Sequence, residues 1–316
     1  MKKMIWLIHR EYWENKTLLV WTHAALALII ALLYSIARGA PSYQFSGKFV
    51  EPADMDMLQT QFVLSWLADS FMFSSALLSL LLPLLMTAYC ISSLFNDRQD
   101  RSILFWQSMP VSGVQTLLSK LVFALLLLPL ATFIFSLLTA LLVLIPQIVR
   151  LQMAGLHANV FAGVFGNPVL LITPLKVLAL LPLYVLWALP TVGWLMLVSA
   201  WARSKPALWA VGTPLLTVGL LALLNNNLSL GLNMRWLEFN VIGRGLMSSI
   251  PGSWFAYAKL LSKDDVSCMR SFSGWPGDMF RPSLDMFAKP ELWCGVLLGI
   301  VMLVMAVYFR QRRDIG

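Results

Sequence analysis

Apolar residues gather along the chain in six long runs that polar segments separate. The runs cover residues 18–37, 70–95, 121–145, 175–201, 207–224 and 291–309. Each run has a length within or near the roughly 17 to 25 residues that an α-helix needs to cross a bilayer. Backbone polar groups must be satisfied inside lipid, so such runs are helical. The pattern predicts an all-α integral membrane protein with six transmembrane helices in a single transmembrane domain, residues 1–316.

The division between the fourth and fifth runs depends on a short polar segment from Ala202 to Pro206. Arg203 and Lys205 are charged, and Pro206 disfavours a continuous helix. One uninterrupted helix would reduce the count to five spans. Because each flanking run is long enough to span the membrane, the sequence favours two helices joined by a tight turn.

Lysine and arginine residues near the spans predict the orientation. Twelve lie on one side of the membrane, four lie in the short loops of the other side, and seven lie in 225–290, a loop too long to weigh. The excess predicts that both termini are cytoplasmic. Segment 225–290 is then an extracytoplasmic loop, with two aromatic clusters typical of short re-entrant or interfacial helices. In the last span, Gly295 and Gly299 form a GxxxG pair that allows close helix packing.

The first seventeen residues, 1–17, have the pattern of an amphipathic helix. Met4, Ile5, Ile8 and Tyr12 recur at helical spacing, and the charged residues lie mostly elsewhere on the helical wheel. Such a helix is expected to lie in the membrane surface. The alternative is a frayed basic tail that only sets the topology.

Composition supports a membrane protein and limits its chemistry. Hydrophobic residues make up 59% and charged residues 12%, against about 45–50% and about 25% in soluble chains. The net charge of +8 comes from residues that flank the spans, so it does not indicate nucleic-acid binding. The sequence has no P-loop, no HExxH-like spacing and no nucleophile elbow. We therefore expect no catalytic, cofactor-binding or metal-binding residues in this chain.

The spans carry no ionisable side chains away from their ends. Ion-coupled carriers place such groups near the bilayer midplane, where the coupling ion needs a ligand. Any transport would therefore take its energy from elsewhere. The apolar and aromatic interior suits a lipid-like or amphipathic cargo. The alternative is that most of these side chains serve helix packing or lipid contact.

Two of the three cysteines bracket the end of the long polar loop. A Cys268–Cys294 disulfide could form if this loop lies outside the cytoplasm, although one pair does not make a disulfide framework.

Segment 96–120, between the second and third spans, carries an apolar cluster on the expected cytoplasmic side. The pattern predicts a short helix that begins at Asn96 or Asp97 and ends at Pro110, followed by a capping box formed by Ser112 and Gln115. The apolar residues are Ile103, Leu104, Phe105, Trp106 and Met109. An exposed apolar cluster indicates a partner. The alternative is that the cluster folds back against the membrane surface.

This segment resembles the coupling region of ABC-2 type ABC transporter permeases. The matching residues are Asp100-Arg101-Ser102, Ile103-Leu104, Ser108-Met109-Pro110-Val111-Ser112 and Lys120 at the base of the third span. The order of the entry helix, six spans and large outer segment resembles the same family. Many family members have Gly-Thr where this chain has Ser102-Ile103, and 225–290 is longer than usual.

The resemblance implies an ABC-2 (type V exporter-like) fold and a permease subunit in the cytoplasmic (inner) membrane of a bacterium. It implies that two copies of a separate ATPase subunit bind and hydrolyse ATP with Mg²⁺, so this chain itself is not an enzyme. A second permease copy or homologue and membrane lipids are the other expected partners. The residues implied to dock the ATPase are Arg101, Ser102, Ile103, Leu104, Phe105, Trp106, Met109 and Pro110.

Two other classes of protein remain alternatives at this point. One is a membrane-embedded lipid-modifying enzyme with acids of the outer loop as catalysts, and it lacks a paired base or metal ligand. The other is a membrane scaffold or sensor that binds a partner without transport. Within the transporter hypothesis, lipid, peptide, antibiotic and glycan cargo all stay open, as do the direction of transport and the choice between homodimer and heterodimer.

Overall fold

The structure is a computed structural model of the whole chain. It describes residues 2–36, 52–99, 112–153, 166, 168–229, 231, 233–255 and 275–313. Within these ranges the chain forms helices and no strand. Six helical segments are long and apolar enough to cross a membrane. The all-α class and the number of candidate spans are therefore confirmed for the described part of the chain.

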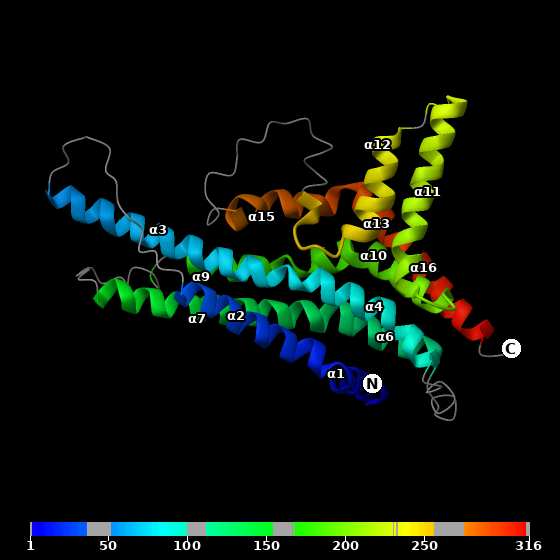
Figure 1. Cartoon of the computed structure of the whole chain (residues 1–316), viewed down its shortest axis with the longest axis horizontal. Coiled ribbons are helices and arrows are strands. Elements are labelled where there is room, and N and C mark those ends of the chain that lie inside the picture. The colour runs from blue at the N-terminus through cyan, green and yellow to red at the C-terminus, as the bar shows by residue number, and fades with distance from the viewer. Residues whose placement is uncertain are drawn as a thin grey trace.

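The elements follow one another in a simple order. They are α1 (Lys2–Glu14), η1 (Thr17–Trp21), α2 (Thr22–Ile36), α3 (Pro52–Ser79), α4 (Leu81–Gln99), α6 (Gly113–Val122), η2 (Phe123–Leu127), α7 (Leu128–Met153), α9 (Pro168–Ala179), α10 (Leu181–Trp201), α11 (Pro206–Leu228), α12 (Met234–Leu237), η3 (Glu238–Gly243), α13 (Arg244–Met247), α15 (Trp275–Asp285), η4 (Met286–Ala288) and α16 (Pro290–Arg313). Figure 1 shows α3 and α4 running on as one long rod, with α6 and α7 beside it in the opposite direction.

The second and third helical rods extend beyond the apolar runs 70–95 and 121–145. Their spanning segments are Val63–Asp97, with 35 residues, and Gly113–Arg150, with 38 residues. In the sequence, charged and polar residues predict the ends of the spans. Lys120 instead lies inside the helical rod, because its side chain is only 3% exposed and its charge is paired within the bundle.

The main hydrophobic core lies between α4, η2, α10 and α16. Its largest fully buried side chains include Trp187, Tyr89 and Phe123. A second cluster joins α3 to α7 through residues such as Leu67 and Leu144. The core therefore holds α4 against α10 at one end of the bundle, while α3 and α7 pair along the other.

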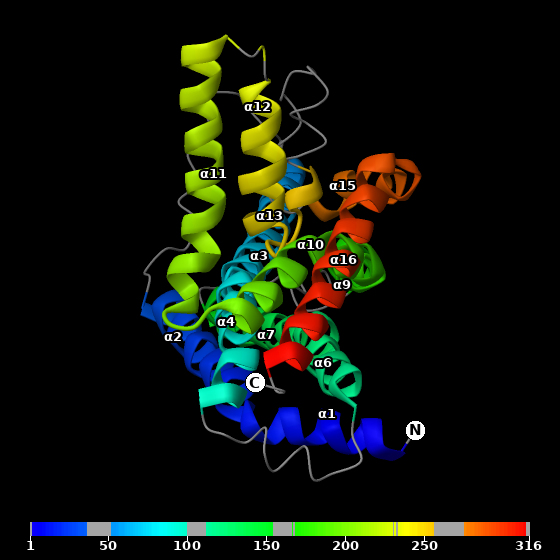
Figure 2. The ribbon, with the colours of Figure 1, turned by 90° about the vertical axis from the view of Figure 1, so that its right-hand side faces the viewer.

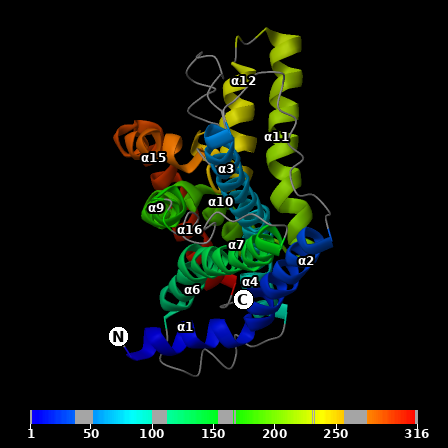
Figure 3. The same ribbon diagram turned by 90° about the vertical axis from the view of Figure 1, so that its left-hand side faces the viewer.

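The turn between α10 and α11 confirms two helices in place of one. Lys205 adopts a left-handed conformation with φ of 46°, and Pro206 begins α11. From this turn α11 diverges from the other spans. Figures 2 and 3 show α11 and α12 side by side, at a steep angle to α1. Most large apolar side chains of α11 are exposed, including Leu216 and Leu220.

Helices α10 and α16 pack with their backbones in contact. A Cβ atom on Gly193 would lie 2.7 Å from the Gly299 carbonyl oxygen, and one on Gly299 would lie 2.8 Å from the carbonyl carbon of Leu189. Gly295, the other half of the GxxxG pair, instead faces the guanidinium of Arg244. The two glycines of the last span therefore serve different contacts.

Replacing Gly299 by alanine should separate α10 from α16. We expect Gly299→Ala to destabilise the protein by about 1–3 kcal/mol, because the added methyl group has no room against a backbone. The measurement is the midpoint of thermal unfolding in detergent. The matched control is Gly212→Ala on α11, where an added Cβ meets nothing within 4 Å. Equal midpoints for the two variants would contradict this account of the packing.

Candidate functional site

Five polar side chains from four helices meet at the end of the bundle where α1 lies. They are Glu11 of α1, Tyr89 and Asp97 of α4, Lys120 of α6 and Arg310 of α16, and together we call them the ionic cluster. Figure 2 shows α1 lying across this end, below α4 and α6. The two carboxylates and two cations balance, so the cluster has no net formal charge.

Lys120 is the centre of the ionic cluster. Its Nζ lies 3.2 Å from Oε1 of Glu11 and 3.3 Å from Oδ1 of Asp97. On the far side of Asp97, the guanidinium Nη2 of Arg310 lies 3.7 Å from Oδ2. The hydroxyl of Tyr89 donates a hydrogen bond to Oε2 of Glu11, at 2.8 Å. One ammonium group thus holds two carboxylates from different helices.

The ionic cluster is removed from solvent. The side chains of Glu11 and Lys120 are 1% and 3% exposed, and those of Asp97 and Arg310 are each 11% exposed. Taking such charges out of water is costly, so each depends on its partners. Removing one partner from a buried pair leaves an uncompensated charge and destabilises a protein by about 3–5 kcal/mol. The four helices are therefore held in one arrangement at this end.

Helix α1 reaches the ionic cluster with a face that differs from its apolar stripe. Leu7 and Glu11, one helical turn apart, are the buried residues of α1, while Ile5 is 63% exposed. The residues expected to face lipid fall outside this contact, with Tyr12 exposed and Met4 and Ile8 partly exposed. The side chain of an acidic residue is thus the main polar anchor of α1, and the apolar stripe stays available on its outer side.

Helix α4 continues through the residues that the sequence suggested as a helix start. It ends at Gln99, so Asn96 and Asp97 lie within its last turn, and the prediction that one of them caps a new helix was wrong. The reason is that Asp97 uses its carboxylate on Lys120 and Arg310, which leaves it no role as a cap.

Helix α6 begins as the sequence predicted. Ser112 and Gln115 form the capping box: the Gln115 backbone N–H donates to Ser112 Oγ, and the Ser112 N–H donates to Gln115 Oε1, each at 3.3 Å. Two turns later, Lys120 points into the ionic cluster. The ion pair between Asp97 and Lys120 therefore joins the two helices that flank 100–111.

A serine from α10 enters the hydrogen-bond ladder of α4 close to the ionic cluster. The hydroxyl oxygen of Ser199 accepts from the backbone N–H groups of Leu94 and Phe95, at 3.2 and 3.0 Å, and donates to the carbonyl of Ile91 at 2.7 Å. In a regular helix the N–H of Phe95 would bond to Ile91 itself. Such an inserted side chain can bend a helix, and here it fixes the end of α4 to α10.

The residues implied to dock an ATPase, from Arg101 to Pro110, lie outside the described residues. So does Cys268, while Cys294 is exposed on α16. The docking assignment and the disulfide both stay predictions. Among the residues that the structure describes, no group of three or more histidine, cysteine or acidic side chains could hold a metal ion.

Of the ionic cluster, the sequence singled out Lys120, through the resemblance, and Asp97, as a possible helix cap. Glu11 carried a usable signal, because it follows Leu7 by four positions on a helix that must pack against something. Arg310 had no such signal. It lies about 190 residues from Lys120, and only the packing of α16 against α10 and α6 brings it near.

Comparison of the chain with protein-family models, with curated proteins and with solved structures finds no match. The fold and the site define a helical protein of multi-pass membrane character, with a buried ionic cluster at one end of its bundle.

Removing the central cation should destabilise the bundle. We expect Lys120→Met to lower the free energy of unfolding by about 3–5 kcal/mol, because Glu11 and Asp97 then face each other without a cation between them. The measurement is thermal unfolding in detergent. The control is Arg10→Met, which breaks the exposed pair Arg10–Glu14. Such a surface pair contributes at most about 1 kcal/mol.

The combined variant Glu11→Gln with Lys120→Met tests whether charge imbalance is the cause. It removes one charge of each sign, so part of the lost stability should return. A double variant as unstable as the two single losses added together would contradict the electrostatic explanation.

Proposed function

We propose that this protein is the membrane-spanning permease subunit of an ATP-driven exporter of the ABC-2 type. The resemblance of segment 96–120 to the coupling region of such permeases motivates the proposal. The observation that carries it is the ionic cluster, which connects both helices flanking 100–111 with α1 and α16. A segment that is pushed by a partner can move the spans only if the helices on either side of it are firmly attached to the rest of the bundle.

In this proposal the ionic cluster transmits a displacement of the docking segment to the spans. A push on 100–111 acts on the end of α4 and the start of α6. Because Lys120 holds Asp97 and Glu11 together, α1 moves with them. Packed interiors deform little and transmit strain, so the helices shift as rigid rods.

The contacts of α10 extend the same path through the protein. Ser199 attaches α10 to the end of α4, and the glycine contact attaches α10 to α16. Arg310 closes the path by joining α16 to Asp97. The connected unit is α1, α4, α6, α10 and α16, and α11 diverges from it after the turn at Lys205.

The energy source in this proposal is a partner. We infer that two copies of a separate ATPase subunit bind ATP and Mg²⁺, and that this chain hydrolyses nothing. Away from their ends the apolar runs hold no Asp, Glu, Lys or Arg of the kind that ion-coupled carriers use, and the buried His23 bonds to Thr132. The chain inserts as a multi-pass protein of the bacterial inner membrane, with both termini and the ionic cluster on the cytoplasmic side. A second permease copy or lipid covers the exposed apolar surface of α11.

The proposal predicts that charges in the docking segment abolish assembly. In Leu104→Glu with Phe105→Glu, two carboxylates would enter an apolar groove of the ATPase, which is costly. We expect the tagged variant to insert normally and to lose the ATPase on co-purification from its native membrane. The readouts are mass spectrometry of the bound protein and ATP hydrolysis.

The matched control adds two glutamates to another segment that is expected on the cytoplasmic side. Arg203→Glu with Ser204→Glu changes exposed residues of the turn between α10 and α11 and should leave co-purification intact. If the docking variant retains a stoichiometric ATPase, the coupling assignment fails. Recovery of the unmodified chain alone, without ATP hydrolysis, would instead favour an enzyme or a scaffold.

A further inference from the structure

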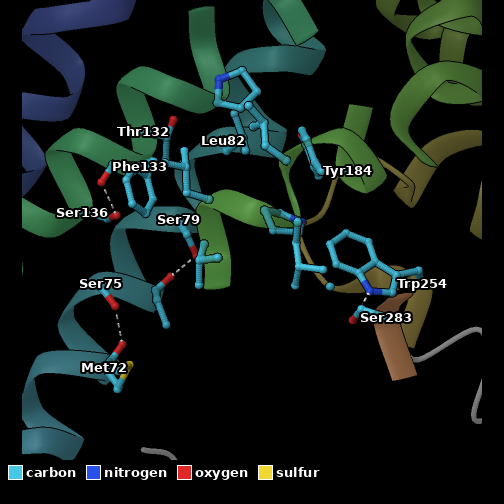
Figure 4. Close-up of a pocket in the computed structure, with 18 residues that line it drawn as sticks. Met72, Ser75, Ser79, Leu82, Thr132, Phe133, Ser136, Tyr184, Trp254 and Ser283 are labelled. Carbon is cyan, nitrogen blue, oxygen red and sulfur yellow. Dashed lines mark hydrogen bonds between the residues drawn. The ribbon is translucent and has the colours of Figure 1, made fainter. Parts of the chain in front are cut away.

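A cavity of about 220 Å³ lies between α3, α7, α9 and α10, in the half of the bundle away from α1. Figure 4 shows labelled side chains of α3 and α7 on one side, with Tyr184 and Trp254 on the other. Its size exceeds that of an engineered apolar cavity of about 150 Å³ that stays dry and binds benzene. A cavity of this size within membrane-spanning helices needs an occupant of matching polarity.

The walls of the cavity are uncharged, and their hydroxyl groups are already used. None of the lining side chains is acidic or basic. Ser75 donates to the carbonyl of Met72, Ser79 to that of Ala76, and Ser136 to that of Phe133, at 2.7 to 2.8 Å. Each serine hydrogen thus stays on its own helix. The cavity therefore favours hydrocarbon over a polar ligand.

The end of the cavity beyond α10 is closed by residues 251–254 and by α15. Gly252 has a φ of 81°, which permits the tight turn that brings Trp254 to the cavity. The indole Nε1 of Trp254 donates to Ser283 Oγ at 2.9 Å. The hydroxyl of Tyr184 donates to the Ser249 carbonyl at 2.8 Å. These bonds fix the positions of Trp254 and Tyr184 in the cavity wall.

The opening lies toward α9, where lining residues Val177 and Leu178 are exposed. Lys176 immediately precedes them, and its ammonium lies 5.9 Å from the ring centroid of Phe280 on α15. The lining of the cavity has no charged side chain. Lys176 adjoins the lining residue Val177 and is the basic residue nearest to the lining along the chain.

Distances along the helices place the cavity and Lys176 toward the bilayer surface opposite the ionic cluster. At 1.5 Å per residue, Leu82 and Met72 lie roughly 22 and 37 Å from Asp97 along α4 and α3. Ser199 lies beside the end of α4, and Lys176 is roughly 34 Å from it along α10 and α9. A hydrocarbon core is about 30 Å thick. With the ionic cluster at one surface, Lys176 lies at the headgroup level of the opposite leaflet.

We propose that this cavity binds one acyl chain of an anionic phospholipid from the leaflet opposite α1, with the phosphate beside Lys176. The apolar walls take the chain, and the ammonium takes the negative charge. Basic residues at the membrane surface attract anionic lipids. The site requires only that the protein spans a membrane, so it is independent of the proposed transport function.

The test uses the full chain in lipid vesicles that contain a photoreactive phospholipid. One preparation contains phosphatidylglycerol with a diazirine near the end of one acyl chain, and the other contains the same chain on phosphatidylcholine. After irradiation, labelled peptides are located by mass spectrometry. We expect labelling of 72–82 and 129–136 to exceed that of the lipid-exposed 208–224 several-fold. Phosphatidylglycerol should label the cavity several-fold more than phosphatidylcholine.

Filling the cavity after folding provides the decisive variant. Ala76→Cys, in a background with Cys268→Ser and Cys294→Ser, can be alkylated with a hexyl reagent once the protein is in the membrane. Cys90 is buried and should not react. Alkylation at position 76 should reduce labelling of 129–136 several-fold. The same reaction at Leu84→Cys, an exposed position outside the cavity, should leave it unchanged.

The headgroup contact has its own matched pair of variants. Lys176→Gln should remove the preference for phosphatidylglycerol, and Lys205→Gln, at the opposite end of the bundle, should keep it. Equal labelling by the two lipids would overturn the anionic headgroup. Cavity labelling equal to that of 208–224, or unaffected by alkylation, would overturn the acyl-chain site. Either failure leaves ATPase co-purification unaffected, so it can be separated from failure of the proposed function.

Discussion

The structure depends on a single buried ammonium group. Lys120 lies between the carboxylates of Glu11 and Asp97, and it holds the entry helix, the end of α4 and the start of α6 in one place. Hydrophobic attraction has no direction of its own, whereas a buried charge can be satisfied in few arrangements. The Tyr89 hydroxyl and the Arg310 guanidinium complete the set.

The two ends of the bundle differ in chemistry. The end at α1 is held by charges and by Ser199 in the backbone of α4, and its core is filled by large side chains such as Tyr89 and Phe123. The other end contains a cavity whose hydroxyl groups bond to their own helices. A rigid, polar end suits the transmission of force, and an uncharged hollow suits a hydrocarbon chain. The proposed function uses the first and the lipid site uses the second.

Glycine decides how closely α10 and α16 pack. The contact of Gly193 with Gly299 lets the backbones of α10 and α16 touch, so a shift of one helix moves the other. The turn at Lys205 and Pro206 has the opposite effect, because it directs α11 away from this unit. Local backbone features thus decide which helices form the connected unit and which helix lies outside it. The sequence indicates the turn at Pro206, but it does not show that Gly193 meets Gly299.

The sequence by itself determined the helices, because the apolar runs, the proline at 206 and the capping box at Ser112 act locally. It also determined that Lys120 immediately precedes an apolar run, although it could not show which groups pair with its charge. Only the tertiary structure decided that Glu11 faces inward, that Asp97 pairs in place of capping, and that Arg310 joins them. The physical reason is that a buried charge is satisfied by partners far away in the chain, and their meeting depends on how whole helices pack.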